Sequence, residues 1–351
     1  MRPYTVAAVL FAALPTFAGC APRPSYAWSP QWHAGRFDNP PEWLSRHGGA
    51  REALRWLLGK RPEAEPFRPP TVPNDGAALR ANTTRYSLTW LGHATVLVQS
   101  GGVNVLTDPN YARCLGGVFC RRAPPGLALS CLPPVDVVLI SHNHRDHLDE
   151  DSVHALARAT DARLLFLVPL GLAPWFRAHG LPRVVELDWW QSFTVETAQG
   201  RATLTLVPAQ HWSRRSLDDE NRSLWGGWII DAGNHRTFFA GDSGYPAAFR
   251  EVGRRFPGID VALLPIGAYE PRWFMRPQHM SPVEAATAFR ELGARLAVGI
   301  HWGTFRLSDE PMAEPPRLFA RSLGADAARV LPLSIGETWF EDPARDPAAR
   351  K

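Results

Sequence analysis

The pattern of apolar and polar positions divides the chain near residue 86. Before it, the sequence is rich in Pro, Trp and Arg and shows no sustained alternation, although residues 41–58 could form a short amphipathic helix. After it, short β-rich runs predict strands, and Gly-Gly at 101 and 102 predicts a hairpin turn. The first predicted strands cover residues 87–91, 96–100, 103–107 and 135–140. The pattern predicts an N-terminal extension that wraps a folded core.

Helical segments then alternate with strands along the rest of the chain. Ser281, Pro282 and Glu284 form a capping-box pattern with Pro at the first helical position, so a helix is predicted from there to Leu292. With 45% hydrophobic residues, the chain can bury a sizeable core. We expect a mixed α/β domain over residues 86–351.

The first twenty residues have the pattern of an export signal. Arg2 supplies the positive end, residues 6–18 are apolar except for one Thr, and small residues lead directly to Cys20. The apolar run is too short for a permanent membrane span. Its ending resembles the lipobox of bacterial lipoproteins, which implies a signal peptide over 1–19 and a lipid anchor at Cys20. Ala21 then favours the outer membrane, facing the periplasm. Ordinary secretion is the alternative.

Charge and cysteine content limit the partners and the kind of metal site. The 38 basic and 34 acidic residues are spread along the chain, so nucleic-acid binding is not indicated. An exported protein meets oxidising conditions. Cys114 and Cys120 could close a short loop and leave Cys131 unpaired, but three pairings are open. No CxxC pair occurs, which argues against a cysteine zinc site.

The candidate chemistry is concentrated directly after the predicted strand at 135–140. There, Ser-His-Asn-His-Arg-Asp-His places three histidines and an aspartate on a strand-to-helix loop. His142 and His144 are two residues apart and can point the same way from extended backbone, while Asp146 and His147 can turn toward a second ion. Three isolated residues, His211, Asp242 and His301, each follow another apolar β-like run. Together these residues predict a two-metal site.

In this order the residues resemble the ligand set of the metallo-β-lactamase superfamily. The resemblance implies that His142, His144 and His211 bind one ion, that Asp146, His147 and His301 bind the second, and that Asp242 bridges them. The residues around these motifs are similar to those of the N-acylphosphatidylethanolamine-hydrolysing phospholipase D branch and its bacterial relatives. The matching segments are Trp90-Leu91-Gly92-His93-Ala94-Thr95, Leu106-Thr107-Asp108-Pro109, Pro208-Ala209-Gln210-His211-Trp212-Ser213 and Leu224-Trp225-Gly226-Gly227-Trp228. The similarity extends from about residue 37 to 340 and departs at residues 113–131.

The resemblance implies a fold and a mechanism. The fold is a four-layer αββα sandwich of two mixed sheets, with the metals at one edge. Two ions lower the pKa of a shared water and stabilise both oxygens of an in-line displacement at phosphorus. Asp146 orients the resulting hydroxide and accepts its proton. Histidine and aspartate ligands without thiolate favour two zinc ions, although iron or manganese also fits.

His93 and Asp108 stand beside predicted strand ends in the matching segments. They are candidates to orient the ligands, while core packing by His93 and turn capping by Asp108 are equally compatible with the sequence. No GxSxG elbow occurs, and neither lysine follows a His by two residues, so the serine-hydrolase and His-x-Lys phospholipase D mechanisms are not indicated.

Residues 270–280 alternate apolar bulk with two arginines and a histidine, as expected of a loop over a phospholipid-binding groove. Trp273, Phe274 and Met275 are candidates to meet acyl chains, and Arg272 or Arg276 to meet a phosphate. The alternative is an ordinary packed loop in which Arg272 pairs with Glu270. The resemblance also places His279 near the cleft, as a substrate contact and catalytic candidate.

Three functions are compatible with the sequence. The favoured one is a phosphodiesterase of phospholipase D type that acts on (N-acyl)phosphatidylethanolamine-like envelope phospholipids. The second is a metal-dependent hydrolase of another ester, a lactone or a lactam on the same fold. The third is a non-catalytic envelope lipoprotein. Such a protein would be expected to have lost ligand residues, but all seven candidate ligands are present. The sequence does not indicate an oligomeric state.

Overall fold

The structure is a computed structural model and describes residues 25–43, 50–59, 62, 66–160 and 164–342. The predicted signal peptide and Cys20 lie outside these residues. Within them, no helix is long and apolar enough to cross a bilayer.

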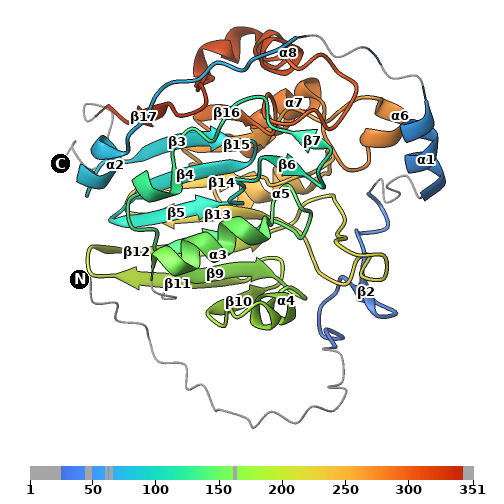
Figure 1. Ribbon diagram of the computed structural model, residues 1–351, viewed down its shortest axis with the longest axis horizontal. Helices are drawn as coiled ribbons and strands as arrows, with labels where there is room; N and C mark the ends of the chain where they lie inside the picture. Colours follow the sequence, from blue (N-terminus) through green and yellow to red (C-terminus); the bar gives the residue numbers. More distant parts are fainter. Residues whose placement is uncertain (1–24, 44–49, 60–61, 63–65, 161–163, 343–351) are drawn as a thin grey trace.

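Two large sheets form the centre of the described part of the molecule (Figure 1). One has seven strands in the order β10-β9-β8-β5-β4-β3-β17, and the other has six in the order β11-β12-β13-β14-β15-β16. The first comprises β3 (Ser87–Gly92), β4 (Thr95–Ser100), β5 (Val103–Thr107), β8 (Val137–Leu139), β9 (Leu165–Pro169), β10 (Val184–Leu187) and β17 (Thr338–Phe340). The second comprises β11 (Ser192–Thr197), β12 (Gly200–Val207), β13 (Gly227–Ala232), β14 (His235–Phe239), β15 (Val261–Pro265) and β16 (Leu296–Ile300).

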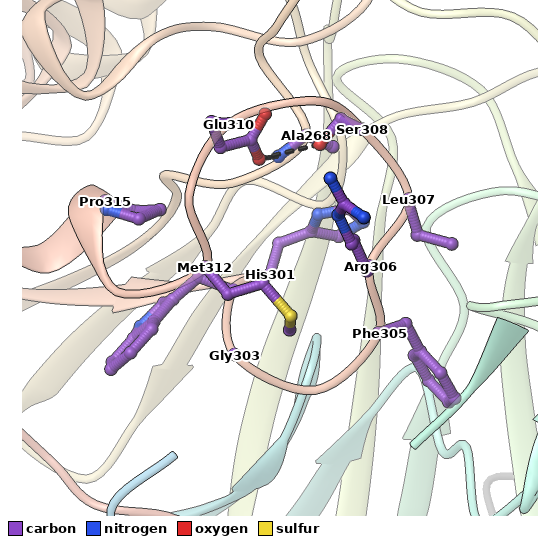
Figure 2. A pocket seen from close by; sticks show the side chains of 11 residues that line it. Ala268, His301, Gly303, Phe305, Arg306, Leu307, Ser308, Glu310, Met312 and Pro315 are labelled. Carbon is purple, nitrogen blue, oxygen red and sulfur yellow. Dashed lines mark hydrogen bonds between the residues drawn. The ribbon is translucent and has the colours of Figure 1, made fainter. Parts of the chain in front are cut away.

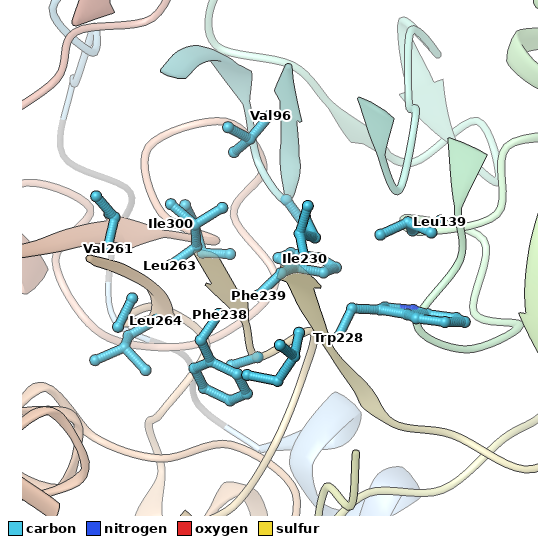
Figure 3. Close-up of a cluster of buried hydrophobic side chains, with 14 of the residues drawn as sticks. Val96, Leu139, Trp228, Ile230, Phe238, Phe239, Val261, Leu263, Leu264 and Ile300 are labelled. Atoms are coloured by element: carbon cyan, nitrogen blue, oxygen red, sulfur yellow. The ribbon is translucent and has the colours of Figure 1, made fainter. Parts of the chain in front are cut away.

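Both faces of the seven-stranded sheet are apolar, because it is covered on both sides. In β8, Val137 and Leu139 join the core between the sheets, while Val138 joins a second cluster under helices α3 (Glu150–Ala159) and α4 (Ala173–Ala178). Figure 3 shows Leu139 and Val96 facing Ile230 and Trp228 of the other sheet. Full burial of such a side chain contributes roughly 1.5–3 kcal/mol. Because successive side chains of a strand point to opposite faces, this burial fixes the face that each strand turns toward the core.

Helices α5 (Ala248–Arg255), α7 (Pro282–Leu292) and α8 (Glu314–Leu323) cover the other sheet. Phe238 of β14 packs edge-to-face on Phe249 of α5, with ring centroids 6.1 Å apart. The α7 capping box is present: Ser281 N–H donates to the Glu284 carboxylate (2.8 Å) and Glu284 N–H to the Ser281 hydroxyl (3.3 Å). The helices and sheets form four layers, so the predicted αββα sandwich is confirmed.

Two boundaries differ from the sequence predictions. The strand predicted over 135–140 is shorter, because Asp136 accepts a hydrogen bond from Asn104 N–H at one end and the metal-candidate loop begins at the other. In the segment predicted as a helix over 41–58, α1 covers Ala50–Leu58, while residues 41–43 form a turn after Pro40 and Pro41. Residues 44–49 lie outside the described part.

The remaining elements are short. They are β1 (Trp32–His33), β2 (Arg36–Phe37), α2 (Ala77–Ala81), β6 (Cys114–Leu115), β7 (Phe119–Cys120), a 3₁₀ turn (Leu129–Cys131), α6 (Arg272–Met275) and a second 3₁₀ turn (Gly324–Arg329). A disulfide joins Cys114 to Cys120 across the β6–β7 hairpin, and Cys131 is a free thiol.

The described part of the N-terminal segment lies along the core. The Tyr26 hydroxyl donates to Glu186 (3.0 Å), and the ring of Trp43 stacks on Trp189 with centroids 5.7 Å apart. Closer to the candidate site, the Asn39 side-chain amide donates to the carbonyl oxygen of His211 (2.8 Å). The segment therefore contacts strand β10, the connection from β10 to β11, and the residues after β12.

Candidate metal centre

The candidate ligands meet at one edge of the sandwich, because each follows the end of a strand. The loop 142–149 connects β8 to α3, His211 follows β12, Asp242 follows β14, and His301 follows β16. Strands β14, β15 and β16 are parallel, as are β5, β8 and β9, so their carboxyl ends deliver these side chains to the same place.

The first group consists of His142, His144 and His211. Nε2 of His142 lies 2.8 Å from Nδ1 of His144, and Nε2 of His211 lies 3.2 Å from the same atom. The His211 ring donates from Nδ1 to the carbonyl oxygen of Gln278 (2.9 Å), which leaves a lone pair on Nε2. The lone pairs on Nε2 of His142 and of His211 thus point to the same place beside His144, where one metal ion could bind them together.

The tautomer of His142 is set in the same way by Ser141. The Ser141 hydroxyl donates to Oδ2 of Asp108 (2.5 Å), so toward His142 it can only accept, from Nδ1–H (2.9 Å). Nε2 of His142 therefore carries its lone pair toward the group. Ligand histidines in metal sites are commonly oriented by such a second hydrogen bond.

The second group lies around Asp242 and Asp146. Nε2 of His147 is 3.0 Å from Oδ2 of Asp242, and Nε2 of His301 is 3.2 Å from Oδ1. Oδ2 of Asp146 lies 3.5 Å from both ring nitrogens. Asp242 also faces the first group, with its Oδ2 3.9 Å from Nε2 of His142 and of His211. Asp242 thus stands between the two groups.

Several of these atoms are buried without a hydrogen-bond partner among the described residues. They are Nε2 of His147, Nε2 of His301 and Oδ1 of Asp242. Leaving a buried polar atom unsatisfied costs about 1–3 kcal/mol, so a group that binds these atoms would stabilise this part of the core. Divalent cations satisfy imidazole nitrogens and carboxylate oxygens together, so the donor set fits metal ions.

The electrostatic surroundings favour neutral rings in the first group and ionised carboxylates, which are the protonation states that bind a metal ion. Burial lowers the pKa of His142 and His144 well below the ordinary value and that of His211 to about 4, so these rings are neutral. Burial alone would raise the pKa of Asp242 and Asp146, but the neighbouring His147 outweighs it and holds both well below their usual range. Both carboxylates are therefore ionised.

The same carboxylates act on the rings of the second group. Burial opposes their protonation, but Asp242 and Asp146 outweigh it, raising the pKa of His301 to about 9 and that of His147 well above its ordinary value. A metal ion and a proton compete for these nitrogens. Nδ1 of His147 donates to Oδ2 of Asp108 (2.7 Å), so Nε2 is the atom that a cation would bind.

His93 and Asp108 both lie against this group. Asp108 is fully buried and accepts from Ser141 N–H (2.7 Å) as well as from His147. His93 Nε2 is 3.0 Å from Oδ2 of Asp146, close enough for His93 to join the candidate donor set. The backbones of His93, Asp108 and His301 all have positive φ (53°, 33° and 61°), a conformation that costs energy and concentrates at functional sites.

The segment 270–280, for which the sequence allows a loop over a groove or a packed loop, contains a short helix. Residues 272–275 form the short helix α6, with Phe274 and Met275 buried and Trp273 and Arg276 exposed. The Arg272 guanidinium donates to Glu284 (2.6 Å) and to the carbonyl oxygen of His279 (3.0 Å). The alternative pairing with Glu270 is wrong for the side chain, because only the backbone N–H of Arg272 donates to that carboxylate.

His279 reaches the metal-candidate cluster. Its Nδ1 lies 3.8 Å from Oδ2 of Asp242, and its ring is 5.3 Å from that of His211. Burial lowers its pKa to about 3, so the ring is neutral. Arg272 holds the backbone of His279 and is not free to meet a phosphate.

The loop after His301 lines a hollow beside that ligand, with Phe305, Arg306 and Met312 around it (Figure 2). Glu310 secures the loop: its carboxylate accepts from Ala268 N–H and from the Ser308 hydroxyl, each at 2.7 Å. The position of His301 is thus tied to the loop that follows β15.

Sequence reasoning missed three residues that hold the ligand loops. Ser141 sets the tautomer of His142, Asn39 binds the backbone of His211, and Arg215 donates to the carbonyl oxygens of Asn143 (3.1 Å) and Leu148 (2.5 Å). Only Ser141, which directly precedes His142, carries a sequence signal. Asn39 and Arg215 act across long sequence separations through backbone carbonyls.

With this geometry in place, comparison with known proteins identifies the family. Residues 103–302 match the family described as "Beta-lactamase superfamily domain". The chain belongs to the beta-lactamase superfamily. As a member of it, with His and Asp groups that could hold metal ions, the chain is a metal-dependent hydrolase of the metallo-β-lactamase fold.

Individual relatives in the superfamily carry informative names. A Caenorhabditis elegans protein named N-acyl-phosphatidylethanolamine-hydrolyzing phospholipase D 1 is 40% identical over 72% of this chain and 74% of its own length. A metal-dependent hydrolase of Methanopyrus kandleri is 31% identical over 72% and 98%. The solved metallo hydrolase of Ignicoccus hospitalis superposes with a TM-score of 0.57 at 23% identity, over 74% of this chain and 99% of that one, and shows the shared fold.

Proposed function

We propose that the protein is a phosphodiesterase of phospholipase D type that hydrolyses (N-acyl)phosphatidylethanolamine-like phospholipids. The observation that carries this proposal is the 40% identity to a relative named for that reaction, over 72% of the chain. In the reaction, hydroxide attacks phosphorus and the bond from phosphorus to the ethanolamine oxygen breaks. The products are phosphatidic acid and the free N-acylethanolamine. The proton that leaves the water passes to the departing oxygen, and the other proton stays on the new P–OH group.

In this proposal His142, His144 and His211 hold one ion, Asp146, His147 and His301 hold the second, and Asp242 bridges them. Divalent cations held by these residues would lower the pKa of a water and stabilise charge on the phosphate. Zinc suits the donors best, and iron and manganese are the other candidates. Asp146, ionised and 3.0 Å from His93, orients the attacking water and accepts its proton.

His279 is the proposed substrate contact. Because its ring is neutral and reaches the cluster from the α6 side, it can donate a hydrogen bond to a phosphate oxygen without carrying charge. Of the other candidates in this segment, Trp273 and Arg276 are exposed and can meet a lipid, whereas Phe274 and Met275 pack into the fold.

We further propose that the chain is an envelope lipoprotein, with a signal peptide over 1–19, a lipid anchor at Cys20, an extension over 20–85 and the hydrolase domain over 86–351. The basis is the sequence pattern of the first twenty residues. Mass spectrometry of the membrane-extracted protein should show an acylated N-terminal cysteine. A mature chain with an unmodified Cys20 would contradict the anchor.

The substrate proposal is tested on metal-loaded protein by incubation with phospholipids of different headgroups. We expect release of N-acylethanolamine or another headgroup alcohol, and its loss on chelation and return on metal addition. Nitrocefin, an acyl-homoserine lactone and bis(p-nitrophenyl) phosphate, tested alongside, separate this activity from a lactamase or lactonase. Turnover of the lactam or lactone with no glycerophospholipid hydrolysed would reject the proposal.

A further inference from the structure

Three segments that are hydrogen-bonded to the candidate metal loops each carry an exposed apolar side chain. Val118, at the tip of the β6–β7 hairpin, is 74% exposed; Leu217, in the loop after His211, is 92% exposed; and Trp273 of α6 is 49% exposed. Figure 1 shows β6, β7 and α6 on the same side of the molecule. A single exposed apolar side chain is ordinary, so these three gain significance only from their shared attachment to the candidate site.

Each of the three segments is bonded to the candidate site. Arg122 N–H in the hairpin segment donates to the carbonyl oxygen of Thr304 (2.9 Å), three residues after His301. The loop that carries Leu217 is attached through Arg215 to the backbone of the 142–149 loop. The helix that carries Trp273 is attached through Arg272 to His279. A surface that touches all three tips would therefore face the metal centre.

The charge of the hairpin segment indicates the partner. Residues 109–135 contain Arg113, Arg121 and Arg122 and no acidic residue or lysine. Arg113 and Arg122 are exposed and, among the described residues, form no ion pair. The disulfide between Cys114 and Cys120 closes the hairpin, which holds Val118 and these arginines in fixed relation. Exposed arginines next to exposed apolar side chains suit a surface of anionic headgroups over acyl chains.

We propose that Val118, Leu217 and Trp273, with Arg113 and Arg122, form a docking surface for an anionic phospholipid bilayer that presents the metal centre to lipid. The inference rests on the proposed phospholipid substrate. Docking by the disulfide-closed hairpin is independent of an anchor at Cys20: an anchor keeps the protein near the membrane, whereas this surface orients the site toward it.

The test measures binding of the metal-loaded full chain, carrying Cys20→Ser so that no lipid anchor contributes, to vesicles of phosphatidylcholine, with and without phosphatidylglycerol. The doubly substituted Val118→Asp, Leu217→Asp variant should lose at least about tenfold in vesicle affinity, because two apolar anchors become charged. The Arg113→Gln, Arg122→Gln variant should lose affinity only for vesicles that contain phosphatidylglycerol. The matched control is Val72→Asp, since Val72 is 40% exposed and lies outside the three segments.

Hydrolysis of soluble bis(p-nitrophenyl) phosphate and light scattering on the same samples separate the outcomes. Loss of vesicle binding with unchanged soluble turnover and unchanged molar mass supports docking. Unchanged vesicle binding by the Val118→Asp, Leu217→Asp variant overturns it, and so does a shift from dimer to monomer, which would make this face a contact between copies. Vesicle binding as expected with no phospholipid hydrolysed would instead reject the proposed substrate and leave docking intact.

Discussion

At the scale of single residues, the candidate site depends on groups that set the protonation of the ligands. Asp108 is the clearest case, since it is fully buried and binds both Ser141 and the ring of His147. Its hydrogen bond to Nδ1 keeps Nε2 of His147 available on the side of Asp242. Asp108 is not among the candidate ligands, but it controls which nitrogen of His147 can bind a metal ion.

Replacement Asp108→Asn should lower metal affinity by about 10- to 100-fold, because the amide is a weaker acceptor and no longer supports the His147 ring. Competition with a chromogenic chelator measures the change. The matched control is Asp231→Asn, which removes a carboxylate from an ion pair with Arg236 on β13–β14. Metal affinity that is the same in both variants would show that Asp108 has only a structural role.

A second residue-scale prediction concerns the competition between protons and metal. The pKa of His301 is raised to about 9 by Asp242 and Asp146 in spite of burial, and that of His147 is raised as well. A cation must displace those protons, so metal affinity should increase with pH up to about 9 and fall as the pH drops below it. Titration with zinc in buffers across this range would show it; affinity independent of pH would contradict the assignment of these rings as ligands.

At the scale of elements, the ends of secondary structure deliver the functional groups. The helix over Pro282–Leu292 and the strand over Leu296–Ile300 have the ends that the sequence predicts, since the capping box and the apolar run mark them locally. Strand β8 is shorter than its apolar run. Ile140 N–H still donates to Leu167 of the neighbouring β9, but the chain then enters the metal-candidate loop, and at the other end the Asp136 side chain accepts from Asn104 N–H. Local signals thus locate elements, while tertiary hydrogen bonds decide their last residues.

The capping box of α7 gives a prediction for stability. Ser281→Ala removes the side chain that accepts from Glu284 N–H and should lower the free energy of unfolding by about 1 kcal/mol, with Ser281→Thr restoring most of it. Urea unfolding of the two variants beside the wild type measures the difference. Equal stability of the alanine and threonine variants would show that the cap contributes nothing.

The N-terminal segment acts on the site through Asn39. Asn39→Ala removes the donor to the carbonyl oxygen of His211 and the acceptor for the Trp225 ring N–H (3.2 Å). We expect a loss of about 1 kcal/mol in stability and faster metal release than from wild type. Stopped-flow release into chelator is the measurement. A variant that is less stable but releases metal at the wild-type rate would limit the segment to a structural role.

At the scale of the whole molecule, the sequence predicted more of the candidate site than of the sheet order. Motif spacing brings His142, His144, Asp146 and His147 onto one loop, and the apolar runs before His211, Asp242 and His301 put those residues at strand ends. The order β10-β9-β8-β5-β4-β3-β17 depends on contacts between distant strands, such as Thr338 with Thr89. The four-layer architecture came from resemblance to a family, because periodicity alone does not distinguish among topologies.

The roles of residues 272–276 could not be assigned from pattern. Alternating apolar and basic residues are equally compatible with a lipid-facing loop and with a short amphipathic helix, and the partner that decides between them is Glu284 on the next helix. Asn39 shows the same limit, since its bond to His211 spans 172 positions. The sequence could not predict which polar groups that are distant along the chain form hydrogen bonds in the fold.

The most direct test of the central claim is the metal content of the purified protein, measured against its phosphodiesterase activity during stepwise removal of metal. We expect two divalent ions per chain, with activity lost as they are withdrawn and a much lower metal content in Asp242→Ala. Full activity in protein that contains one ion or none would contradict it.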